Sequence, residues 1–246
     1  MQEVLSEDGS YTLYSKEFKQ HYHSLSDGAL NESLIKHVIP ALSYHENKST
    51  LKILDICFGL GYNSLATLCY LDKQIKANKK VEIYSPELDK NLVKSLESFP
   101  YPKEFENNKH IIKSLSSELL YEDGNIKIQI FNEDARNFVK NTKINFDIIY
   151  QDAFSKDVNP LLWTKEFFED IYKKSNKDAI LTTYSIARGI RQDLYNSGFF
   201  LFEYIPIKRK STLAFKSEPK SVAQENKNFQ DIFMSCKSLE SKLAKP

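Results

Sequence analysis

The sequence contains little cysteine, and what it has is scattered. Its 246 residues include three cysteines, Cys57, Cys69 and Cys236, and no two of them form a CxxC pair. This distribution argues against a disulfide framework or a cysteine-based zinc site, and reduced thiols are typical of a cytoplasmic protein. Long apolar runs are also lacking. None approaches the length of a membrane span, and the polar start has no signal-peptide core. We therefore expect a cytoplasmic protein with no membrane partner.

An excess of charge of either sign is absent too. Lys+Arg is 34 and Asp+Glu is 33, which leaves a formal net charge of +1. Such a balance does not by itself indicate a nucleic-acid binder, although a local basic patch can serve where the total is neutral. Glycine is scarce as well, with seven in the whole chain, yet Gly59 and Gly61 stand one residue apart.

Short apolar runs alternate with longer amphipathic segments from residue 51 onward. Runs rich in Ile, Leu and Val are typical of strands buried on both faces, and their alternation with helical segments predicts a parallel sheet covered by helices on both sides. The expected strands are 51–57, 80–86, 125–132, 145–152 and 179–185, and the expected helices between them are 62–77, 88–98, 111–121, 134–141 and 164–175.

The end of the sheet has a different pattern. After an expected helix at 187–197, two strands at 199–207 and 210–216 are separated by a short basic link, so they should pair antiparallel. A mostly parallel, seven-stranded α/β sheet finished by such a hairpin resembles the Rossmann-like fold of class I S-adenosylmethionine-dependent methyltransferases. We expect residues 51–216 to form this domain. Residues 1–50, with a helix at 29–43, would be an N-terminal extension or lid, and residues 217–246 a polar C-terminal helix, from about 222 to 243, or a loosely held tail.

The stretch "DICFGLGYN" places the two glycines just after the first strand of the sheet. Ligands of open α/β sheets bind at the carboxyl ends of strands, where Gly59 and Gly61 would let a ligand lie against the backbone, and a helix beginning near Asn63 offers free N–H groups. A dinucleotide site would need a third glycine, where Ser64 stands, and Asp55 would repel a pyrophosphate. The charge of Asp55 suits S-adenosylmethionine (SAM) better, and a tight turn without a ligand is the alternative.

Acidic residues also follow the next two strands. Glu87 ends the second strand, where a carboxylate can accept hydrogen bonds from ribose hydroxyls, or simply stabilise a helix N-terminus. Asp134 and Ala135 follow the third strand, where the acid can accept from the adenine amino group and the small residue leaves room for the ring. The alternative for Asp134 is an N-cap.

The fourth strand delivers Asp152 to the same edge, followed by a loop with Phe154 and Trp163, the chain's single tryptophan. Methyl transfer to an amine is an in-line displacement, and a carboxylate here would accept a proton from the amine or orient it. Phe154 and Trp163 would exclude water. The alternative for Asp152 is a cap or a structural acid.

Four stretches carry a resemblance to a known family: "DGSYTLYSKEFKQHYHS…GALNESL", "DICFGLGYN", "QDAFSKDVNPLLWTKEFF" and "ILTTYSIARGIRQDLYNSGF". They resemble the methyltransferase half of the MnmC family of bifunctional tRNA 5-methylaminomethyl-2-thiouridine biosynthesis proteins, over nearly all of residues 8–216. The resemblance implies SAM-dependent methylation of the 5-aminomethyl group of a tRNA wobble uridine, giving 5-methylaminomethyl(-2-thio)uridine. It also implies no FAD, because the oxidoreductase half is absent, no metal, and a separate enzyme that supplies the aminomethyl group.

The resemblance also implies roles for individual residues. Asp152 would be catalytic, and the SAM-binding residues would be Asp55, Phe58, Gly59, Gly61, Asn63, Glu87, Asp134 and Ala135. Two positions depart from the family pattern: Cys57 stands where glycine is usual, and Arg188 stands where a smaller residue is common.

A tRNA substrate would need contacts for phosphate and for the extruded base. Five cations, Arg188, Arg191, Lys208, Arg209 and Lys210, would form one basic rim if the hairpin returns beside the preceding helix. The flipped uridine would stack on an aromatic ring, for which the candidates are Tyr14, Phe154 and Tyr184, with Trp163 nearby. His21 and His23 alternate in "QHYHS", but a metal site would need a third ligand, so a lid contact or a surface role is favoured.

Other functions use nearly the same parts. An aminopropyltransferase holds a nucleoside sulfonium on this fold and activates a diamine with an aspartate, and it needs no basic rim. A methyltransferase acting on a small amine is another possibility. A binding module that has lost catalysis, with Cys57 as its sign, and a dinucleotide oxidoreductase are the remaining alternatives.

Overall fold

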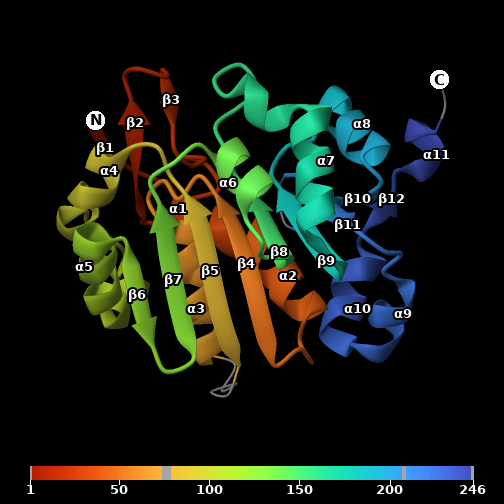
Figure 1. The fold of residues 1–246 in the computed structure, drawn as a ribbon, viewed down its shortest axis with the longest axis horizontal. Coiled ribbons are helices and arrows are strands. Elements are labelled where there is room, and N and C mark those ends of the chain that lie inside the picture. Colours follow the sequence, from red (N-terminus) through yellow and green to blue (C-terminus); the bar gives the residue numbers. More distant parts are fainter. Residues whose placement is uncertain (1, 74–78, 207–208, 245–246) are drawn as a thin grey trace.

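A large mixed sheet organises the chain in the computed structural model, which describes residues 2–73, 79–206 and 209–244 (Figure 1). Nine strands stand in the order β12-β10-β11-β9-β8-β4-β5-β7-β6. The five central strands are parallel, so their carboxyl ends meet at one edge. They are β4 (Thr50–Ile56), β5 (Lys80–Pro86), β7 (Ile126–Phe131), β8 (Phe146–Gln151) and β9 (Ser175–Thr183).

The predicted antiparallel hairpin is present. It consists of β10 (Phe200–Tyr204) and β11 (Ser211–Phe215), and β11 pairs with β9. Together with the parallel strands it makes the seven-stranded block expected from the sequence, which confirms the α/β, Rossmann-like fold class. Two short antiparallel strands extend the block at its edges, β6 (Leu120–Asp123) and β12 (Lys237–Ser238).

The strand β6 occupies part of a segment predicted as helix. The helix ends at Glu118 because Leu119 takes a left-handed conformation with φ of 59°. Gly124, also at positive φ, then turns β6 back into β7. A left-handed leucine has no sequence signature, which is why the helix predicted over 111–121 extends past the observed end at Glu118.

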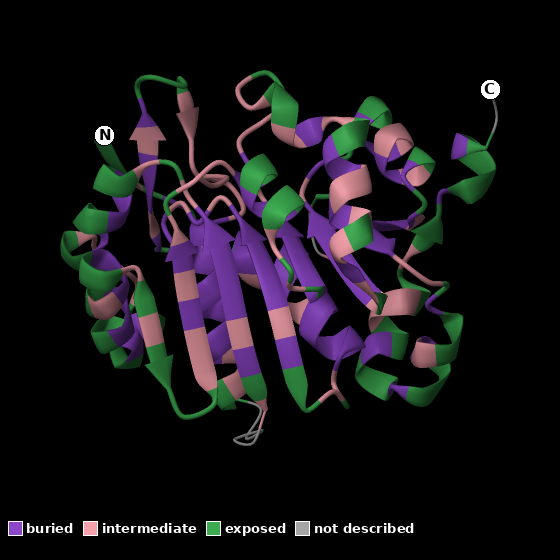
Figure 2. Ribbon diagram, viewed as in Figure 1, coloured by how far each residue is buried: buried purple, intermediate pink, exposed green. Residues whose placement is uncertain are grey.

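Helices cover both faces of the sheet, and most of the central strands are buried (Figure 2). Neighbouring residues of β4 show the reason: Ile53 belongs to one hydrophobic cluster and Leu54 to the other, because side chains alternate across a strand. The first cluster includes α3, α4 and α5, and the second includes α6, α7 and α8. Their bounds are α3 (Tyr62–Lys73), α4 (Lys90–Ser95), α5 (Lys109–Glu118), α6 (Ala135–Asn141), α7 (Lys165–Lys174) and α8 (Arg188–Asn196), with 3-10 turns at Leu96–Ser98, Lys103–Asn108 and Pro160–Trp163.

The N-terminal section has two parts. A small antiparallel sheet of β1 (Gln2–Leu5), β2 (Tyr11–Ser15) and β3 (Gln20–His21) lies beyond the carboxyl ends of the central strands (Figure 1). The helix that follows runs through α1 (Ala29–Glu32), the π-helical segment η1 (Ser33–Val38) and α2 (Ile39–Tyr44). This helix packs against α3 and β9, so it covers a face of the sheet and not its carboxyl edge.

The C-terminal section is built into the core, contrary to the expectation of one peripheral helix or a loose tail. It contains three short helices, α9 (Lys220–Glu225), α10 (Lys227–Met234) and α11 (Glu240–Leu243). The Asn226 side chain caps α10 and donates to the Ser43 carbonyl. Phe229 is fully buried and packs edge-on against Tyr44 and Phe215. No helix among the described residues is long and apolar enough to cross a bilayer.

Candidate active site

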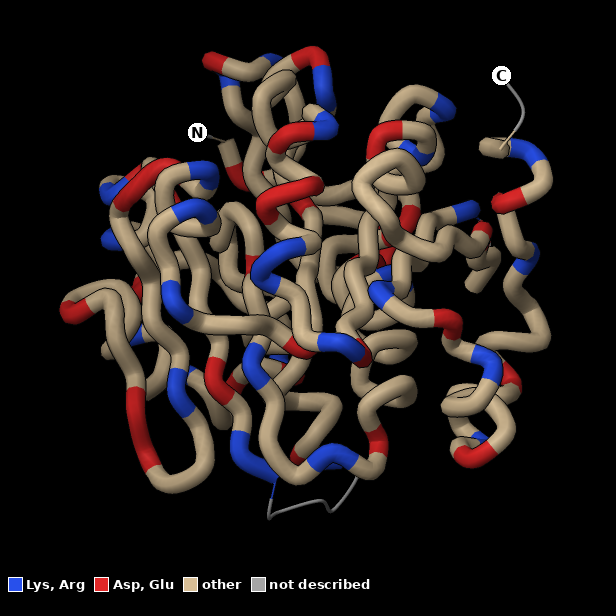
Figure 3. The backbone as a smooth tube through the Cα atoms, turned by 45° about the vertical axis from the view of Figure 1, so that its right-hand side comes forward, with Lys and Arg blue, Asp and Glu red and all other residues tan. Residues whose placement is uncertain are grey.

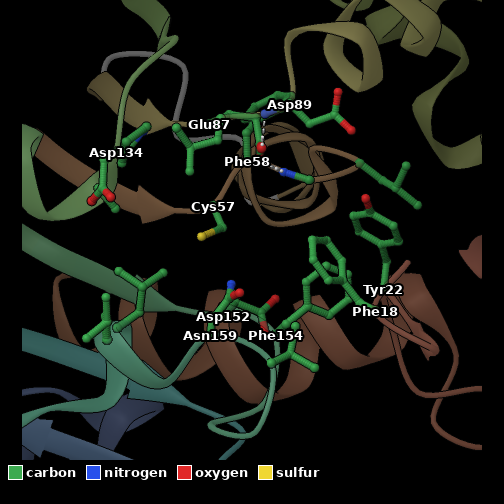
Figure 4. A pocket seen from close by; sticks show the side chains of 18 of the residues that line it. Phe18, Tyr22, Cys57, Phe58, Glu87, Asp89, Asp134, Asp152, Phe154 and Asn159 are labelled. Carbon is green, nitrogen blue, oxygen red and sulfur yellow. Dashed lines mark hydrogen bonds between the residues drawn. The ribbon is translucent and has the colours of Figure 1, made fainter. Parts of the chain in front are cut away.

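A cavity of about 640 Å³ opens at the carboxyl edge of the sheet (Figure 4). Its walls come from the loops after β4, β5, β7 and β8, together with Glu17, Phe18, Tyr22 and His23, which flank the short strand β3. This volume lies within the range of small-molecule sites, and its position is where open α/β sheets bind ligands.

The glycine turn forms one wall of the cavity, and its two glycines have different structural roles. Gly61 has a φ of 73°, and a Cβ there would lie 2.7 Å from the Phe58 ring, so the Phe58 ring itself requires this glycine. Gly59, with a φ of 54°, lines the cavity and donates its N–H to Glu87 Oε2 at 2.9 Å. The sequence predicts that a ligand lies close to the backbone at both glycines. At Gly61, however, the group that lies close is the Phe58 ring.

Glu87 is held with its carboxylate at the cavity wall. Oε2 accepts from Gly59, and Oε1 accepts from the N–H of Asp89 at 2.8 Å. Burial raises the pKa of Glu87, and the backbone hydrogen bonds from Asp89 and Gly59 oppose that rise. A carboxylate oxygen accepts more than one hydrogen bond, so both oxygens can still receive ribose hydroxyls.

Asp134 lies where the sequence predicts but is already engaged. It caps α6 by accepting from the N–H of Arg136 at 2.8 Å, and its Oδ2 forms an ion pair with the Arg136 guanidinium at 2.6 Å. These bonds to Arg136 lower the pKa of Asp134. Asp134, Ala135 and Arg136 all line the cavity, so the N-cap interpretation and a place in the site both hold.

Asp55 does not line the cavity, against the sequence-based expectation of direct contact with a cationic ligand. It is fully buried, accepts from Ser64 Oγ at 2.7 Å, and lies 3.4 Å from Nδ2 of Asn63. Burial raises its pKa to about 7. Its side chain therefore fastens the first turn of α3 to the end of β4.

Asp152 does line the cavity, as does Cys57 (Figure 4). Its Oδ2 accepts from Asn63 Nδ2 at 2.9 Å, and its Oδ1 lies 3.5 Å from Nε2 of His37. Burial alone would raise the pKa of Asp152, but His37, His23 and Asn63 outweigh it and the pKa is lowered. The carboxylate is therefore ionised at neutral pH.

Three of the aromatic residues predicted to contact the substrate do not line the cavity. Trp163 is fully buried, and its indole N–H donates to the Phe154 carbonyl at 2.7 Å. The Tyr184 hydroxyl donates to the Ala153 carbonyl at 2.9 Å. Both residues therefore support the loop after β8 and do not line the cavity, and Tyr14, which packs on His21, does not line it either.

Phe154 is the predicted aromatic residue that does line the cavity. Its ring contacts Tyr22 edge-on, with 4.7 Å between centroids, and Phe18 at 5.2 Å. Phe18 and Tyr22 come from the N-terminal section and also line the cavity, so three rings from two distant segments lie together (Figure 4).

Figure 3 shows basic and acidic positions interspersed along the backbone, and the four predicted cations among the described residues do not form one patch of free charge. Arg191 is buried and pairs with Glu203 at 3.0 Å, and Lys210 pairs with the same carboxylate at 2.9 Å. The Arg191 side chain is used inside the fold because β10 packs against α8, whereas the Lys210 side chain is half exposed. Arg209 lies 3.7 Å from Asp27. Lys208 lies outside the described residues, and Arg188 lines a separate groove with Arg191 and Lys242.

The cavity is strongly acidic. Among the described residues, a single cation, Arg136, lines it. Such a wall favours a ligand with positive charge and repels a pyrophosphate, which argues against a dinucleotide. The lining carboxylates are Glu17, Glu87, Asp89, Glu133, Asp134 and Asp152.

Two histidines lie near Asp152: the sequence suggests a lid contact or a surface role for His23, and it assigns no role to His37. His23 lines the cavity and lies 3.2 Å from Thr12 Oγ1, and burial lowers its pKa. His37 is a lone histidine in the apolar run "LIKHVIP", and its position there was the one available signal. No group of His, Cys, Asp or Glu in the described ranges is arranged to hold a metal ion.

Comparisons with known proteins agree with this architecture. Residues 101–217 match the profile of a family described as S-adenosyl-L-methionine-dependent methyltransferase. The chain is 32% identical over 221 residues to an uncharacterized protein of Methanocaldococcus jannaschii, covering 87% of this chain and 59% of that protein. It is 28% identical over 206 residues to the tRNA 5-methylaminomethyl-2-thiouridine biosynthesis bifunctional protein MnmC of Azoarcus, covering 79% of this chain and 32% of that protein. The chain thus spans less than two thirds of the length of these curated relatives.

Solved structures give the same picture. The crystal structure of MNMC2 from Aquifex aeolicus superimposes with a TM-score of 0.79 at 29% identity, covering 91% of this chain and 74% of that one. Spermidine synthase from Thermotoga maritima shares the fold, with a TM-score of 0.57 at 14% identity, covering 99% and 87%. The chain therefore has the class I, Rossmann-like fold and is similar over most of its length to MnmC-like, SAM-dependent methyltransferase domains.

Proposed function

We propose that this domain transfers a methyl group from SAM to the 5-aminomethyl group of a wobble uridine in tRNA. The observation that carries the proposal is an ionised carboxylate, Asp152, on the wall of an acidic cavity in an MnmC-like domain. We also propose that a separate enzymatic activity supplies the aminomethyl group.

The cavity fits SAM in charge and in hydrogen-bonding groups. Glu87 would hold the ribose hydroxyls, Asp134 and Ala135 the adenine end, and the turn at Gly59 the methionine end, while the surrounding acids balance the positive charge. When bound, SAM supplies an electrophilic methyl group on a sulfonium. Cys57, whose φ is 65°, points its thiol into the same space, and burial keeps its pKa well above the usual value. The thiol thus stays protonated and weakly nucleophilic beside a methyl donor.

Asp152 would act on the acceptor amine. Methyl transfer moves positive charge onto the nitrogen, and a carboxylate beside it stabilises that charge as it develops. Because the pKa of Asp152 is lowered, it is a weak base, and we assign it mainly an orienting and electrostatic role. It would accept a hydrogen bond from the amine and direct the nitrogen lone pair toward the methyl group.

Phe18, Tyr22 and Phe154 would receive the uridine ring. Base-on-aromatic stacking is the usual way in which a protein holds a base extruded from RNA. The half-exposed Phe18 lies at the mouth of the cavity, so a base can reach the rings from solvent. Arg188, which has no ion-pair partner among the described residues, remains a candidate for a phosphate contact.

The test uses purified protein and tRNA that carries 5-aminomethyluridine. We expect SAM binding by calorimetry, and methyl transfer to this tRNA but not to the same tRNA without the aminomethyl group. Asp152→Asn should keep SAM affinity and lower kcat by about 100-fold or more. Asp157→Asn, an exposed aspartate in the same loop, is the matched control and should leave kcat unchanged.

A second experiment distinguishes methyl transfer from aminopropyl transfer, the alternative that the shared fold of spermidine synthase keeps open. The protein is incubated with decarboxylated SAM and putrescine, and the products are analysed by mass spectrometry. Product in this mixture alone would overturn the methyltransferase proposal, and methylated tRNA alone would support it.

A further inference from the structure

His37 is a fully buried histidine whose ring extends from the N-terminal helix to the carboxylate of Asp152. Its Nδ1 lies 2.9 Å from Oγ1 of Thr182, near the end of β9, and its Nε2 lies 3.5 Å from Oδ1 of Asp152. Within the part of the chain that the structure describes, Nε2 is one of the few buried polar atoms that make no hydrogen bond. A buried nitrogen directed at a site carboxylate requires an explanation.

The local backbone points the same way. His37 stands in η1, where the helix from Ala29 to Tyr44 adopts π-helical hydrogen bonding for Ser33–Val38. Such segments are rare and are found frequently at functional sites. This one packs against both α3, which carries Asn63, and β9, which carries Thr182. The irregular turn is thus located where the three elements around Asp152 meet.

The hydrogen-bonding possibilities of the imidazole decide what Nε2 offers to Asp152. If the Thr182 hydroxyl donates to Nδ1, a neutral ring carries its proton on Nε2, facing the carboxylate. If Nδ1 donates to Thr182, a neutral ring places a lone pair against an anion, which is unfavourable. The favourable arrangements, a neutral Nε2–H ring or an imidazolium, both place a donor about 0.5 Å beyond ordinary hydrogen-bond length from Oδ1.

We propose that His37 is a positioning residue for the methyl-transfer reaction: its Nε2–H and the Asn63 amide hold one oxygen each of Asp152 and so fix the direction in which the carboxylate meets the acceptor amine. This inference rests on the proposed function for the identity of the amine. Asn63 alone leaves the carboxylate free to rotate about its held oxygen, and His37 removes that freedom when its hydrogen bond shortens.

Other charged groups also surround Asp152, and a test must account for them. His23, His37 and the Asn63 amide each act to lower the pKa of Asp152. The charge of Asp152 in turn acts to raise the pKa of Asp55, Cys57 and Tyr184. The charge of Glu32 acts to raise the pKa of His23 and Tyr184. His37 also acts on His23, whose pKa it lowers, and on Asp55, whose pKa it lowers. The titrations of His23 and Asp55 are therefore followed alongside that of Asp152, so that the direct effect of His37 on Asp152 is distinguished from an indirect one.

The experiment compares His37→Gln, which keeps an N–H donor, with His37→Leu, which removes it. The first readout is the pKa of the Asp152 carboxyl, followed by carbon-13 NMR and assigned with Asp152→Asn. Losing a donor to the carboxylate raises its pKa, so His37→Leu should raise it and His37→Gln should restore most of the wild-type value. The second readout is kcat against pH. In His37→Leu kcat should fall by on the order of 100-fold, its acid limb should move to higher pH, and KM for SAM should stay unchanged.

An Asp152 titration that is the same in wild type, His37→Gln and His37→Leu would overturn the proposal and leave His37 a packing residue. Should His37→Leu fail to fold, Thr182→Val replaces it, because it removes the hydroxyl that fixes the tautomer and should also raise the Asp152 pKa. If wild-type protein methylates no aminomethyl-bearing tRNA, the proposed function fails, while the NMR titration still decides the role of His37.

Discussion

Asn63 joins two carboxylates of opposite character: its Nδ2 donates to Oδ2 of Asp152 at 2.9 Å and lies 3.4 Å from Oδ1 of Asp55. Burial raises the pKa of Asp55 to about 7, and the Asp152 charge adds to that rise. The pKa of Asp152 itself is lowered, because His37, His23 and Asn63 outweigh its burial. Two carboxylates whose pKa values are pushed apart have separate roles. Asp55 is the structural acid of the pair, and Asp152 is the charged one that lines the cavity.

The first prediction concerns pH and Asp55. The folded state holds a proton on Asp55 up to about pH 7, whereas the unfolded chain releases it near the ordinary aspartate pKa of 3.8. The free energy of unfolding should therefore fall as pH rises through this window, with the full loss above pH 7. Asp55→Asn lacks this loss, so its stability relative to wild type should increase from pH 5 to pH 8, by on the order of 1–3 kcal/mol. Urea unfolding at four pH values measures this difference in stability, with Asp157→Asn as the control. Parallel pH profiles for wild type and Asp55→Asn would contradict it.

The second prediction concerns the glycine turn. Gly61→Ala places a Cβ 2.7 Å from the Phe58 ring at a φ of 73°, so both the backbone and the packing oppose it. We expect the free energy of unfolding to fall by about 2–4 kcal/mol and SAM affinity to fall as Phe58 is displaced. Gly124→Ala is the matched control. Its φ is also positive, but no described atom lies within 4 Å of the added Cβ, so the loss should be about 1 kcal/mol, with SAM affinity intact. Equal losses in the two variants would show that Phe58 plays no part.

The third prediction concerns Cys57, a non-glycine residue in the left-handed region with a φ of 65°. A side chain at such a φ is strained by about 1 kcal/mol relative to glycine. Cys57→Gly should therefore be more stable than Cys57→Ala by about that amount, since both remove the thiol and they differ only in the Cβ. Thermal unfolding of the two variants tests this. If the alanine variant is as stable as the glycine variant, the strain is absent.

What the sequence predicts well is what depends on short-range pattern. Apolar runs and their spacing indicate the five parallel strands and the hairpin, and strand ends indicate where Glu87, Asp134 and Asp152 lie. The direction of a side chain is harder to predict. Asp55 ends the same strand that leads into the glycine turn, but it faces Ser64 of α3 and not the cavity, and nothing in the local sequence distinguishes the two directions.

Contacts between distant segments account for the remaining differences. The Asn226 side chain meets Ser43 across 183 positions, which is why the C-terminal section is part of the core and not a tail. The position of Trp163 in the loop after β8 predicts a place in the cavity, yet its indole is buried and donates to the Phe154 carbonyl. Glu203 offered no sign in the sequence that it would pair with both Arg191 and Lys210.

The last prediction uses this pairing to separate a structural arginine from a candidate RNA contact. Arg191 is buried and bonds Glu203, the Thr212 hydroxyl and the Ser211 carbonyl. Arg191→Ala leaves Glu203 with one partner fewer in a buried site, and the free energy of unfolding should fall by about 3 kcal/mol.

Arg188→Ala, one turn away on the same helix, is the counterpart. Arg188 is exposed and unpaired among the described residues, so stability should change by less than about 0.5 kcal/mol. If Arg188 contacts a phosphate of tRNA, binding should weaken and the slope of log affinity against log salt should become shallower by about 1. Filter binding at several salt concentrations measures the slope, and calorimetry with SAM shows that the cavity is unaffected. Arg191 is already bound within the fold, so Arg188 is the one predicted cation of α8 that is left to contact RNA. An unchanged slope in Arg188→Ala would show that Arg188 makes no such contact.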